Sequence, residues 1–330
     1  MINLESKILE FFSSAKIPFD LANLTSFEEI ESGTFNHLLA INCPAGKFVL
    51  KWSARRLKSD NFQGIDIDRT ERLSAEINTY PIFRKIVGQR LIPKLSAVDP
   101  QKGFILMEKL SKTRMLMDKL LKRELCLAIL EKLGTVLGKI HSATYKLKPT
   151  KILLNRTAWA AEFKYHYLEL MPFVGRKAAK ILQKQIEFHR QNQPVLLHGD
   201  LTCRNILVNG RKFYLIDFEL SRLGYPSYDI GHFLADYYLL ALGQPQSRQK
   251  IFKAVDQFLN NYFKEFKKID RGSVESQTVK DTLVTMIFRL LGRNQTPFIR
   301  DQKDKKILAF QLISLLTKDI NSLPEASRTF

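Results

Sequence analysis

The chain has 330 residues, three cysteines and a formal net charge of +19. This length suits one large domain or two moderate ones, and a chain of this size buries roughly three quarters of its unfolded surface without disulfide staples. The cysteines are odd in number and widely spaced, which excludes a zinc pattern and a disulfide framework and favours a reducing compartment: Cys43, Cys126 and Cys203. We therefore expect a cytoplasmic protein.

The positive charge is concentrated in one stretch of the chain. Residues 101–190 contain 19 Lys or Arg and 7 Asp or Glu, so 12 of the 19 excess charges lie there. One explanation is a basic, solvated helical surface, and the other is weak association with an anionic partner or surface. Lys177, Lys180 and Lys184 are three or four residues apart in one predicted helix, so they share a face. No RNA- or DNA-binding motif accompanies the charge, so we expect no specific nucleic acid binding.

The first twelve residues predict a short amphipathic helix rather than a targeting segment. They carry Glu5 and Glu10 and lack a basic start followed by an apolar run, so we expect no secretory signal. No stretch of the sequence approaches the run of about 18 apolar residues that a transmembrane helix requires. The apolar positions that suggest the helix are Ile2, Leu4, Ile8, Leu9 and Phe12.

The region up to residue 109 is predicted to form a five-stranded sheet with one main helix. Alternating or continuous apolar runs predict strands over 27–30, 37–41, 47–52, 91–98 and 103–107. Residues 70–83 predict a helix, with Leu73, Ile77 and Tyr80 on one face and Pro81 as an irregularity near its end. We assign residues 1–109 to an N-terminal unit.

Residues 110–330 are predicted to form a mainly helical C-terminal unit. Apolar residues recur at helical spacing over 127–141, and 143–193 form a helical insertion whose aromatic residues are expected in the core: Trp159, Phe163, Tyr165, Tyr167 and Phe173. Four further helices are predicted at about 230–242, 247–266, 276–292 and 304–320. The complete chain is therefore assigned to the α+β class.

Residues 198–219 carry the most informative motifs. Asp200 is followed five residues later by Asn205, and Asp217 follows after twelve more residues. Phosphoryl transfer from a nucleotide needs this set, because one carboxylate orients the attacking hydroxyl while an amide and a second carboxylate hold magnesium. Glu219 is a less certain member of the set than Asp217.

A hairpin is predicted to bring two of these residues together. The apolar runs 206–208 and 213–216 are joined by Asn209-Gly210, which is typical of a tight β-turn. Because a hairpin returns the chain, Asn205 and Asp217 lie at the same end of adjacent strands. Magnesium prefers few carboxylates plus phosphate oxygens, and this pair fits that preference.

These motifs resemble those of the aminoglycoside phosphotransferase and choline kinase superfamily, the small-molecule branch of the protein-kinase-like enzymes. The chain has His-Gly-Asp-Leu at 198–201, Asn-Ile-Leu at 205–207 and Ile-Asp-Phe-Glu at 216–219, as that family typically does. A Tyr/Pro-rich turn at 225–231 matches a further family element. The resemblance spans about residues 25–240. It implies a bilobal protein-kinase-like fold, with a nucleotide-binding lobe over residues 1–109 and a catalytic and acceptor-binding lobe over residues 110–330. ATP and Mg²⁺ are expected to bind between the lobes.

The resemblance also implies an ion pair in the N-terminal lobe. Lys51 stands where the family's strand lysine contacts the α- and β-phosphates. Glu76, in the predicted helix 70–83, is expected to pair with Lys51 and fix its direction, and Glu71 is the rival partner.

Two main-chain segments complete the nucleotide site that the resemblance implies. Residues 32–36 correspond to the loop over the phosphates, with Ser32 and Gly33 as its binding residues and one glycine instead of three. Residues 108–110 correspond to the hinge between the lobes. There the main-chain atoms of Glu108 and Leu110 are expected to bind the adenine edge.

In the phosphoryl-transfer mechanism that the resemblance implies, Asp200 is expected to accept or orient the proton of the acceptor hydroxyl. Arg204 either offsets charge on the transferred phosphate or is an ordinary surface arginine. Asp229 is expected to hold the loop that carries Asp200, while His198 organises that loop's main chain and His141 is a packed, hydrogen-bonded histidine.

The expected function is an ATP- and magnesium-dependent small-molecule O-kinase. The basic C-terminal half disfavours polycationic acceptors and favours a neutral or anionic one, such as a sugar or a phosphorylated metabolite. The alternative is a protein kinase or a kinase-like nucleotide-binding regulatory module. Only eleven residues separate Asp217 from Asp229, which is too short for a protein-kinase activation segment.

Overall fold

The computed structural model describes residues 12, 17, 26–30, 36–53, 68–148, 155, 159, 163–164, 166–318, 320–323 and 325. Of the predicted N-terminal helix only Phe12 is among these residues, and the phosphate-loop residues Ser32 and Gly33 lie outside them. Among the described helices, none combines the length and the apolar character that a membrane span requires.

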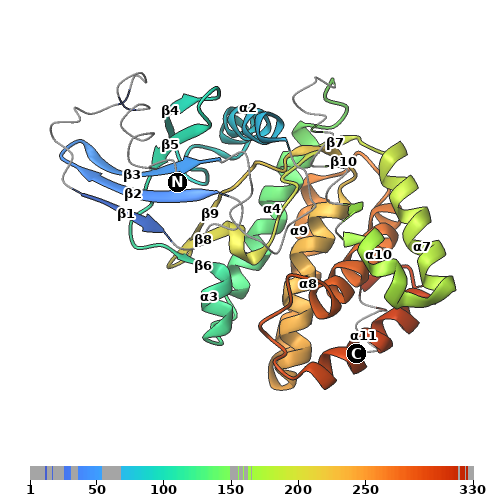
Figure 1. The fold of residues 1–330 in the computed structure, drawn as a ribbon. Coiled ribbons are helices and arrows are strands. Elements are labelled where there is room, and N and C mark those ends of the chain that lie inside the picture. The colour runs from blue at the N-terminus through green and yellow to red at the C-terminus, as the bar shows by residue number, and fades with distance from the viewer. Residues whose placement is uncertain are drawn as a thin grey trace.

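Five antiparallel strands form the N-terminal sheet, as the sequence predicts (Figure 1). Their order is β1 (Ser26–Ile30), β2 (His37–Cys43), β3 (Gly46–Trp52), β5 (Phe104–Glu108) and β4 (Leu95–Asp99). The strand β4 begins four residues later than predicted. Pro93 cannot donate to a ladder, and the Leu91 carbonyl accepts a hydrogen bond from the Leu215 N–H at 2.9 Å instead.

The two faces of this sheet have different partners. Phe104 and Leu106 of β5 belong to one apolar cluster. The alternate residues Ile105 and Met107 pack with Leu73 of the helix α2 (Arg69–Val87). Lys51 lies in register with Ile105 across the β3–β5 ladder. Since side chains directly opposite one another in a ladder share a face, Lys51 points toward α2.

The helix α2 extends four residues beyond its predicted end. Asp68 caps its N-terminus by accepting from the Glu71 N–H at 2.9 Å, and Gly88 ends it. Pro81 removes one N–H from the helix, but the helix continues because Phe83 is fully buried in the main core. Arg72 and Glu76, one turn apart, are both buried on the face toward the sheet.

The rest of the chain is mostly helical (Figure 1). Most residues of the largest hydrophobic core lie there. The helices are α3 (Leu116–Leu121), α4 (Leu127–Ala143), α7 (Met171–Gln191), α8 (Ser227–Gly243), α9 (Arg248–Glu265), α10 (Arg271–Leu291) and α11 (Gln302–Leu316). Main-chain close approach sets the α4–α9 packing, because a Cβ at Gly134 would lie 2.2 Å from the Phe258 carbonyl oxygen. These elements and the sheet confirm the predicted α+β class, whereas the boundary at residue 109 stays a prediction.

Short strands between the sheet and the helices carry the motif residues. The hairpin β8 (Ile206–Asn209) and β9 (Lys212–Leu215) forms as predicted, and β6 (Arg114–Met115) adds to its edge. The strand β7 (Val195–Leu197) pairs with β10 (Arg222–Gly224). The sequence did not predict β6 or β10, because two- and three-residue strands have no detectable period.

One expectation about the aromatic residues is wrong. Trp159, Phe163 and Tyr167 pack in or against the core, as predicted, but the side chain of Phe173 is 64% exposed. Phe173 lies in the first turn of α7, before the helix kinks at Gly175 (φ 74°). The buried face of α7 instead uses Val174, Ala178 and Leu182. Tyr165 lies outside the described residues.

Candidate functional site

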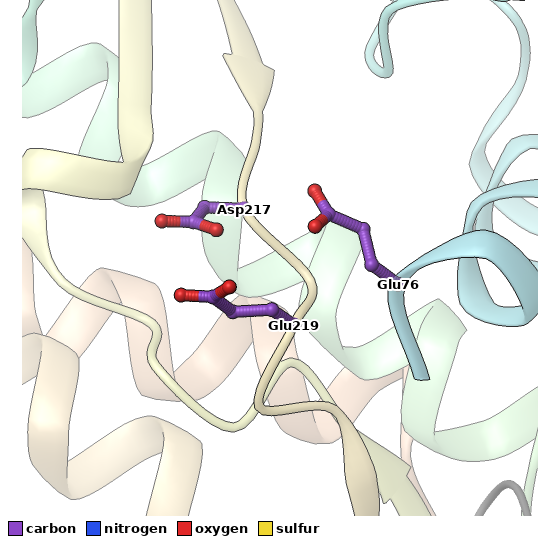
Figure 2. Close-up of side chains that lie close together, drawn as sticks. All are labelled: Glu76, Asp217 and Glu219. Atoms are coloured by element: carbon purple, nitrogen blue, oxygen red, sulfur yellow. The ribbon is translucent and has the colours of Figure 1, made fainter. Parts of the chain in front are cut away.

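Lys51 lies at the centre of a group of buried charges. Its Nζ is 2.6 Å from Glu76 Oε2, 2.5 Å from Asp217 Oδ1 and 3.4 Å from Glu219 Oε2. Figure 2 shows Glu76 reaching from α2 toward the segment that carries Asp217 and Glu219. The predicted pairing with Glu76 is therefore present, and Glu71 is not among the partners of Lys51.

Burial shapes the ionisation of this group. Burial opposes the charge on Lys51, but Asp217, Glu219 and Glu76 outweigh it and raise the pKa of Lys51 well above its usual value. Burial raises the pKa of Glu76 to about 7, although Lys51 acts in the opposite direction. Lys51 is therefore the permanent cation of the group, and Glu76 takes up a proton more readily than an ordinary glutamate does.

Asp217 occupies a special backbone position directly after the hairpin. The Ile216 N–H donates to the Asn205 carbonyl at 3.1 Å, which keeps the two ends of the hairpin paired. Asp217 then adopts φ 68°, a left-handed conformation that is uncommon for residues other than glycine. Such backbone strain concentrates at functional sites, and here it accompanies a side chain that is one third exposed while its neighbours are buried.

The carboxylates beside Lys51 fit a hard divalent cation. One oxygen each from Glu76, Asp217 and Glu219 can be chosen so that all lie within 4.8 Å of one another. Within the described part of the chain, Glu76 Oε1 is buried without a hydrogen-bond partner. Oxygen donors are the ligands that Mg²⁺ prefers. Glu76 and Glu219 are buried, whereas the Asp217 side chain is partly exposed, so Asp217 is the member of this group suited to reach a bound Mg²⁺.

Asn205 holds the carboxylate of Asp200, which the sequence predicts to be the proton acceptor. Its Nδ2 donates to Asp200 Oδ2 at 2.7 Å and to the Asp200 carbonyl at 2.9 Å. Because the amide nitrogen is committed to Asp200, Oδ1 is the atom that Asn205 can offer to a cation. The hairpin and this contact thus bring Asp200, Asn205 and Asp217 into one region, as predicted.

The segment 198–205, which we name the Asp200 loop, is held by carboxylates from α8. Asp229 accepts from the His198 N–H at 2.7 Å and from the Gly199 N–H at 3.0 Å, and Asp236 accepts from the Cys203 N–H at 3.0 Å. Asp229 therefore holds the loop from α8, as predicted. Burial would raise the pKa of Asp229, but hydrogen bonds and nearby charge lower it, so the carboxylate is ionised.

The two histidines near the loop are structural. His198 Nε2 lies 3.1 Å from the Ile216 carbonyl, and burial lowers the pKa of His198, so its neutral ring links the loop to the hairpin. His141 is fully buried, 2.9 Å from Tyr262 Oη and 3.4 Å from Asp229. Both histidines have the structural contacts that the sequence analysis expects.

Gly199 lets the main chain of the Asp200 loop approach the main chain at Leu220 more closely than a residue with a Cβ atom would allow. It has φ 87°, and a Cβ there would lie 2.0 Å from the Leu220 carbonyl oxygen. Leu220 directly follows residues 216–219, which we name the Asp217 segment. The Asp200 loop therefore packs main chain to main chain on the residues just after Asp217 and Glu219.

Three further predicted residues, Arg204, Glu108 and Leu110, make hydrogen bonds within the protein. Arg204 donates to Asn294 Oδ1 at 2.9 Å, so it contacts the loop between α10 and α11. The Glu108 N–H donates to the Lys94 carbonyl at 2.9 Å, which leaves the carbonyl of Glu108 as its candidate atom for the adenine edge. The Leu110 carbonyl accepts from Thr113 Oγ1 at 3.0 Å, which leaves its N–H as the candidate. These assignments remain predictions.

Three polar residues around Glu219 were not recognised in the sequence. Glu219 Oε2 accepts from Asn36 Nδ2 at 2.9 Å and from Arg72 Nη1 at 3.2 Å, and Ser53 Oγ donates to Asn36 Oδ1 at 2.6 Å. All four are buried. The helical spacing of Arg72 and Glu76 was the one available signal, because it places both on the same face of α2.

The exposed face of α7 carries the three lysines singled out in the sequence. Lys177, Lys180 and Lys184 are exposed, and buried residues such as Ala178 and Leu182 occupy the other face. The predicted common face is confirmed. An amphipathic helix of this kind is typical of a solvated protein surface.

Comparison with known families places this site in context. The model of the phosphotransferase enzyme family matches residues 67–250, which include Glu76, the Asp200 loop and the Asp217 segment. This match covers more than half of the chain, so the chain belongs to that family. The predicted superfamily is confirmed.

Individual relatives are more distant. A methylthioribose kinase from Geobacillus thermodenitrificans is 31% identical over 115 residues, which are 34% of this chain and 28% of that protein. A choline/ethanolamine kinase family protein from Mesorhizobium loti is similar in structure, with a TM-score of 0.56 and 15% identity over 100% of this chain and 98% of the other. A spectinomycin phosphotransferase in complex with ADP and spectinomycin has a TM-score of 0.52 and 16% identity over 98% of both chains.

Proposed function

We propose that this member of the phosphotransferase enzyme family is an ATP- and magnesium-dependent kinase that phosphorylates a hydroxyl group of a small molecule. The observation that carries the proposal is the meeting of Lys51, Glu76 and Asp217 from three separate elements, beside an Asp200 carboxylate held by Asn205. Phosphoryl transfer requires a cation for the non-transferred phosphates, ligands for magnesium and a positioned proton acceptor.

The residues take distinct roles in this proposal. Lys51 binds the non-transferred phosphates, and Glu76 fixes its direction from α2. Asp217 and Asn205 would hold Mg²⁺, with Oδ1 of Asn205 as the ligand atom. Bound magnesium would neutralise charge on the phosphates during transfer.

Asp200 orients the acceptor hydroxyl and accepts its proton. The Asn205 amide restricts the Asp200 carboxylate to one direction, so the proton acceptor is in place before the acceptor binds. Positioning is the main requirement, because the transition state of phosphoryl transfer is loose and needs little covalent assistance.

The acceptor is proposed to be a neutral or anionic hydroxylated metabolite. The net charge of +19 disfavours a polycation, because like charges repel during the encounter. The partial match to a methylthioribose kinase supports a sugar-like acceptor. A protein acceptor is disfavoured because only residues 218–226 lie between Asp217 and the start of α8, and three of them form β10.

A product-detection experiment tests this function. The full chain is incubated with magnesium-ATP and, separately, methylthioribose, phosphorylated sugars, choline or an aminoglycoside, and the mixtures are analysed by mass spectrometry. We expect a product heavier by one phosphoryl group for a neutral or anionic acceptor, and no product with Asp200→Asn. Phosphorylation confined to choline or the aminoglycoside would contradict the proposed acceptor class. Phosphorylation by the Asp200→Asn variant at the wild-type rate would contradict the mechanism.

A further inference from the structure

Arg72 is a buried cation beside the site for which the phosphoryl-transfer mechanism gives no role. It is fully buried on α2, one turn before Glu76. Its Nη1 donates to Glu219 Oε2 at 3.2 Å and to Asn36 Oδ1 at 3.4 Å. The same face of α2 therefore supplies an anion to Lys51 and a cation to Glu219.

Glu219 joins the C-terminal part of the site to three N-terminal elements. Its Oε2 contacts Asn36, Arg72 and Lys51, and its side chain is 3% exposed. Asn36 in turn is held by Ser53 Oγ at 2.6 Å. Burying a carboxylate is costly unless opposite charge and hydrogen bonds accompany it, and Arg72 provides both to Glu219.

The charge balance explains why Arg72 matters to Lys51. Three carboxylates surround Lys51, and a Lys ammonium has three N–H donors. Without Arg72, the contacts of Glu219 Oε2 described above would be those with Lys51 and Asn36. The Lys51 ammonium would then be drawn toward Glu219. With Arg72 present, the ammonium keeps donor capacity for phosphate oxygens.

We propose that Arg72 is a positioning residue of the nucleotide site: it holds the Glu219 carboxylate, docks α2 on the segment after Asp217, and so keeps Lys51 directed at the phosphates. This inference rests on the proposed function, because it assumes that Lys51 binds nucleotide phosphates. It assigns Glu219 to the same positioning network, with Oε2 committed to Asn36 and Arg72.

Nucleotide titration of matched variants tests the inference. Arg72→Met, Arg72→Lys and Arg84→Met are purified with the wild type, and ATP binding is measured by calorimetry with magnesium and with EDTA. Arg84 is a matched control, because it lies on the same helix and donates to the Ile92 carbonyl at 3.0 Å. Thermal unfolding of each variant shows whether it is folded.

We expect Arg72→Met to weaken ATP binding roughly 10- to 100-fold, which is the usual effect of removing a residue that orients a ligand-binding side chain. The loss is equal with magnesium and with EDTA, because it acts through Lys51 and not through a metal ligand. Arg72→Lys keeps the charge and recovers part of the affinity, and Arg84→Met binds within about twofold of the wild type.

The outcomes separate the inference from the function on which it rests. A wild type that binds no ATP would contradict the proposed function. Wild-type binding together with equal affinities for folded Arg72→Met and Arg84→Met would overturn only the inference. A loss restricted to magnesium conditions would also overturn it. If Arg72→Met does not fold, Arg72→Lys takes its place: weaker binding than Arg84→Met supports the inference, and equal binding overturns it.

Discussion

In the group of charges around Lys51, carboxylates meet cationic side chains, whereas around the Asp200 loop, Asp229 and Asp236 meet main-chain N–H groups. The first arrangement joins segments that are far apart in the sequence, since Lys51 and Asp217 are separated by 166 positions. The second arrangement fixes the path of one short loop. Substitutions in the charge group should therefore change nucleotide and metal binding, and substitutions around the loop should change the transfer step or the stability.

Asp200→Asn is expected to have the largest effect. The variant should fold and bind magnesium-ATP, because the amide keeps the shape of the side chain and its contact with Asn205. Phosphorylation of the acceptor should fall roughly 10²- to 10⁴-fold, which is the usual cost of losing a positioned proton acceptor. The measurement is kcat with the acceptor identified by product detection. Weaker ATP binding with unchanged kcat would show that Asp200 acts in nucleotide binding and not in the transfer step.

Lys51→Met should show the opposite pattern. It removes a phosphate contact and the central cation of three carboxylates, so kcat/KM for ATP should fall roughly 10²- to 10³-fold. Acceptor affinity should change little, because Lys51 lies in the N-terminal sheet and not in residues 110–330, which are predicted to bind the acceptor. Steady-state kinetics with each substrate varied in turn measures both effects. A selective loss of acceptor binding would contradict this placement.

Gly199→Ala tests the main-chain packing of the Asp200 loop. A Cβ would meet the Leu220 carbonyl oxygen at 2.0 Å, so we expect destabilisation of roughly 3 kcal/mol, as for severe overpacking. Gly210→Ala is the control, because Gly210 also has positive φ (58°) but no atom within 4 Å of its added Cβ. It should cost about 1 kcal/mol, the backbone penalty alone. Equal losses in denaturant unfolding would show that backbone strain, not packing, explains Gly199.

Reversal of the α7 lysines should have the smallest effect on the site. Lys177→Glu, Lys180→Glu and Lys184→Glu together should leave ATP affinity unchanged, because exposed charges are screened over about 8 Å at physiological ionic strength. If this face attracts anions, the triple variant should bind anionic vesicles less well at low salt. The control reverses three exposed lysines of α9, Lys250, Lys253 and Lys264, with the same change in net charge. Equal vesicle binding by both variants would favour simple solvation of the α7 face.

The residues that the sequence predicted well are those with local patterns. The hairpin 206–215 carries an Asn-Gly turn, so its register and the proximity of Asn205 to Asp217 were predictable. The pairing of Lys51 with Glu76 followed from family resemblance and a helical period. The Arg72–Glu219 contact was not predictable, because it joins positions 147 apart and depends on how α2 docks on the Asp217 segment. Pro81 was over-interpreted, since tertiary packing maintains the helix beyond it.

The central claim is that Asp217 is a magnesium ligand of a nucleotide site, and a titration tests it most directly. ATP affinity is measured for the wild type and for Asp217→Ala, each with magnesium and with EDTA. We expect magnesium to tighten ATP binding to the wild type, and this tightening to be largely lost in Asp217→Ala while the affinity in EDTA changes little. Equal shifts in the two conditions would show that Asp217 is not the ligand and would contradict the account.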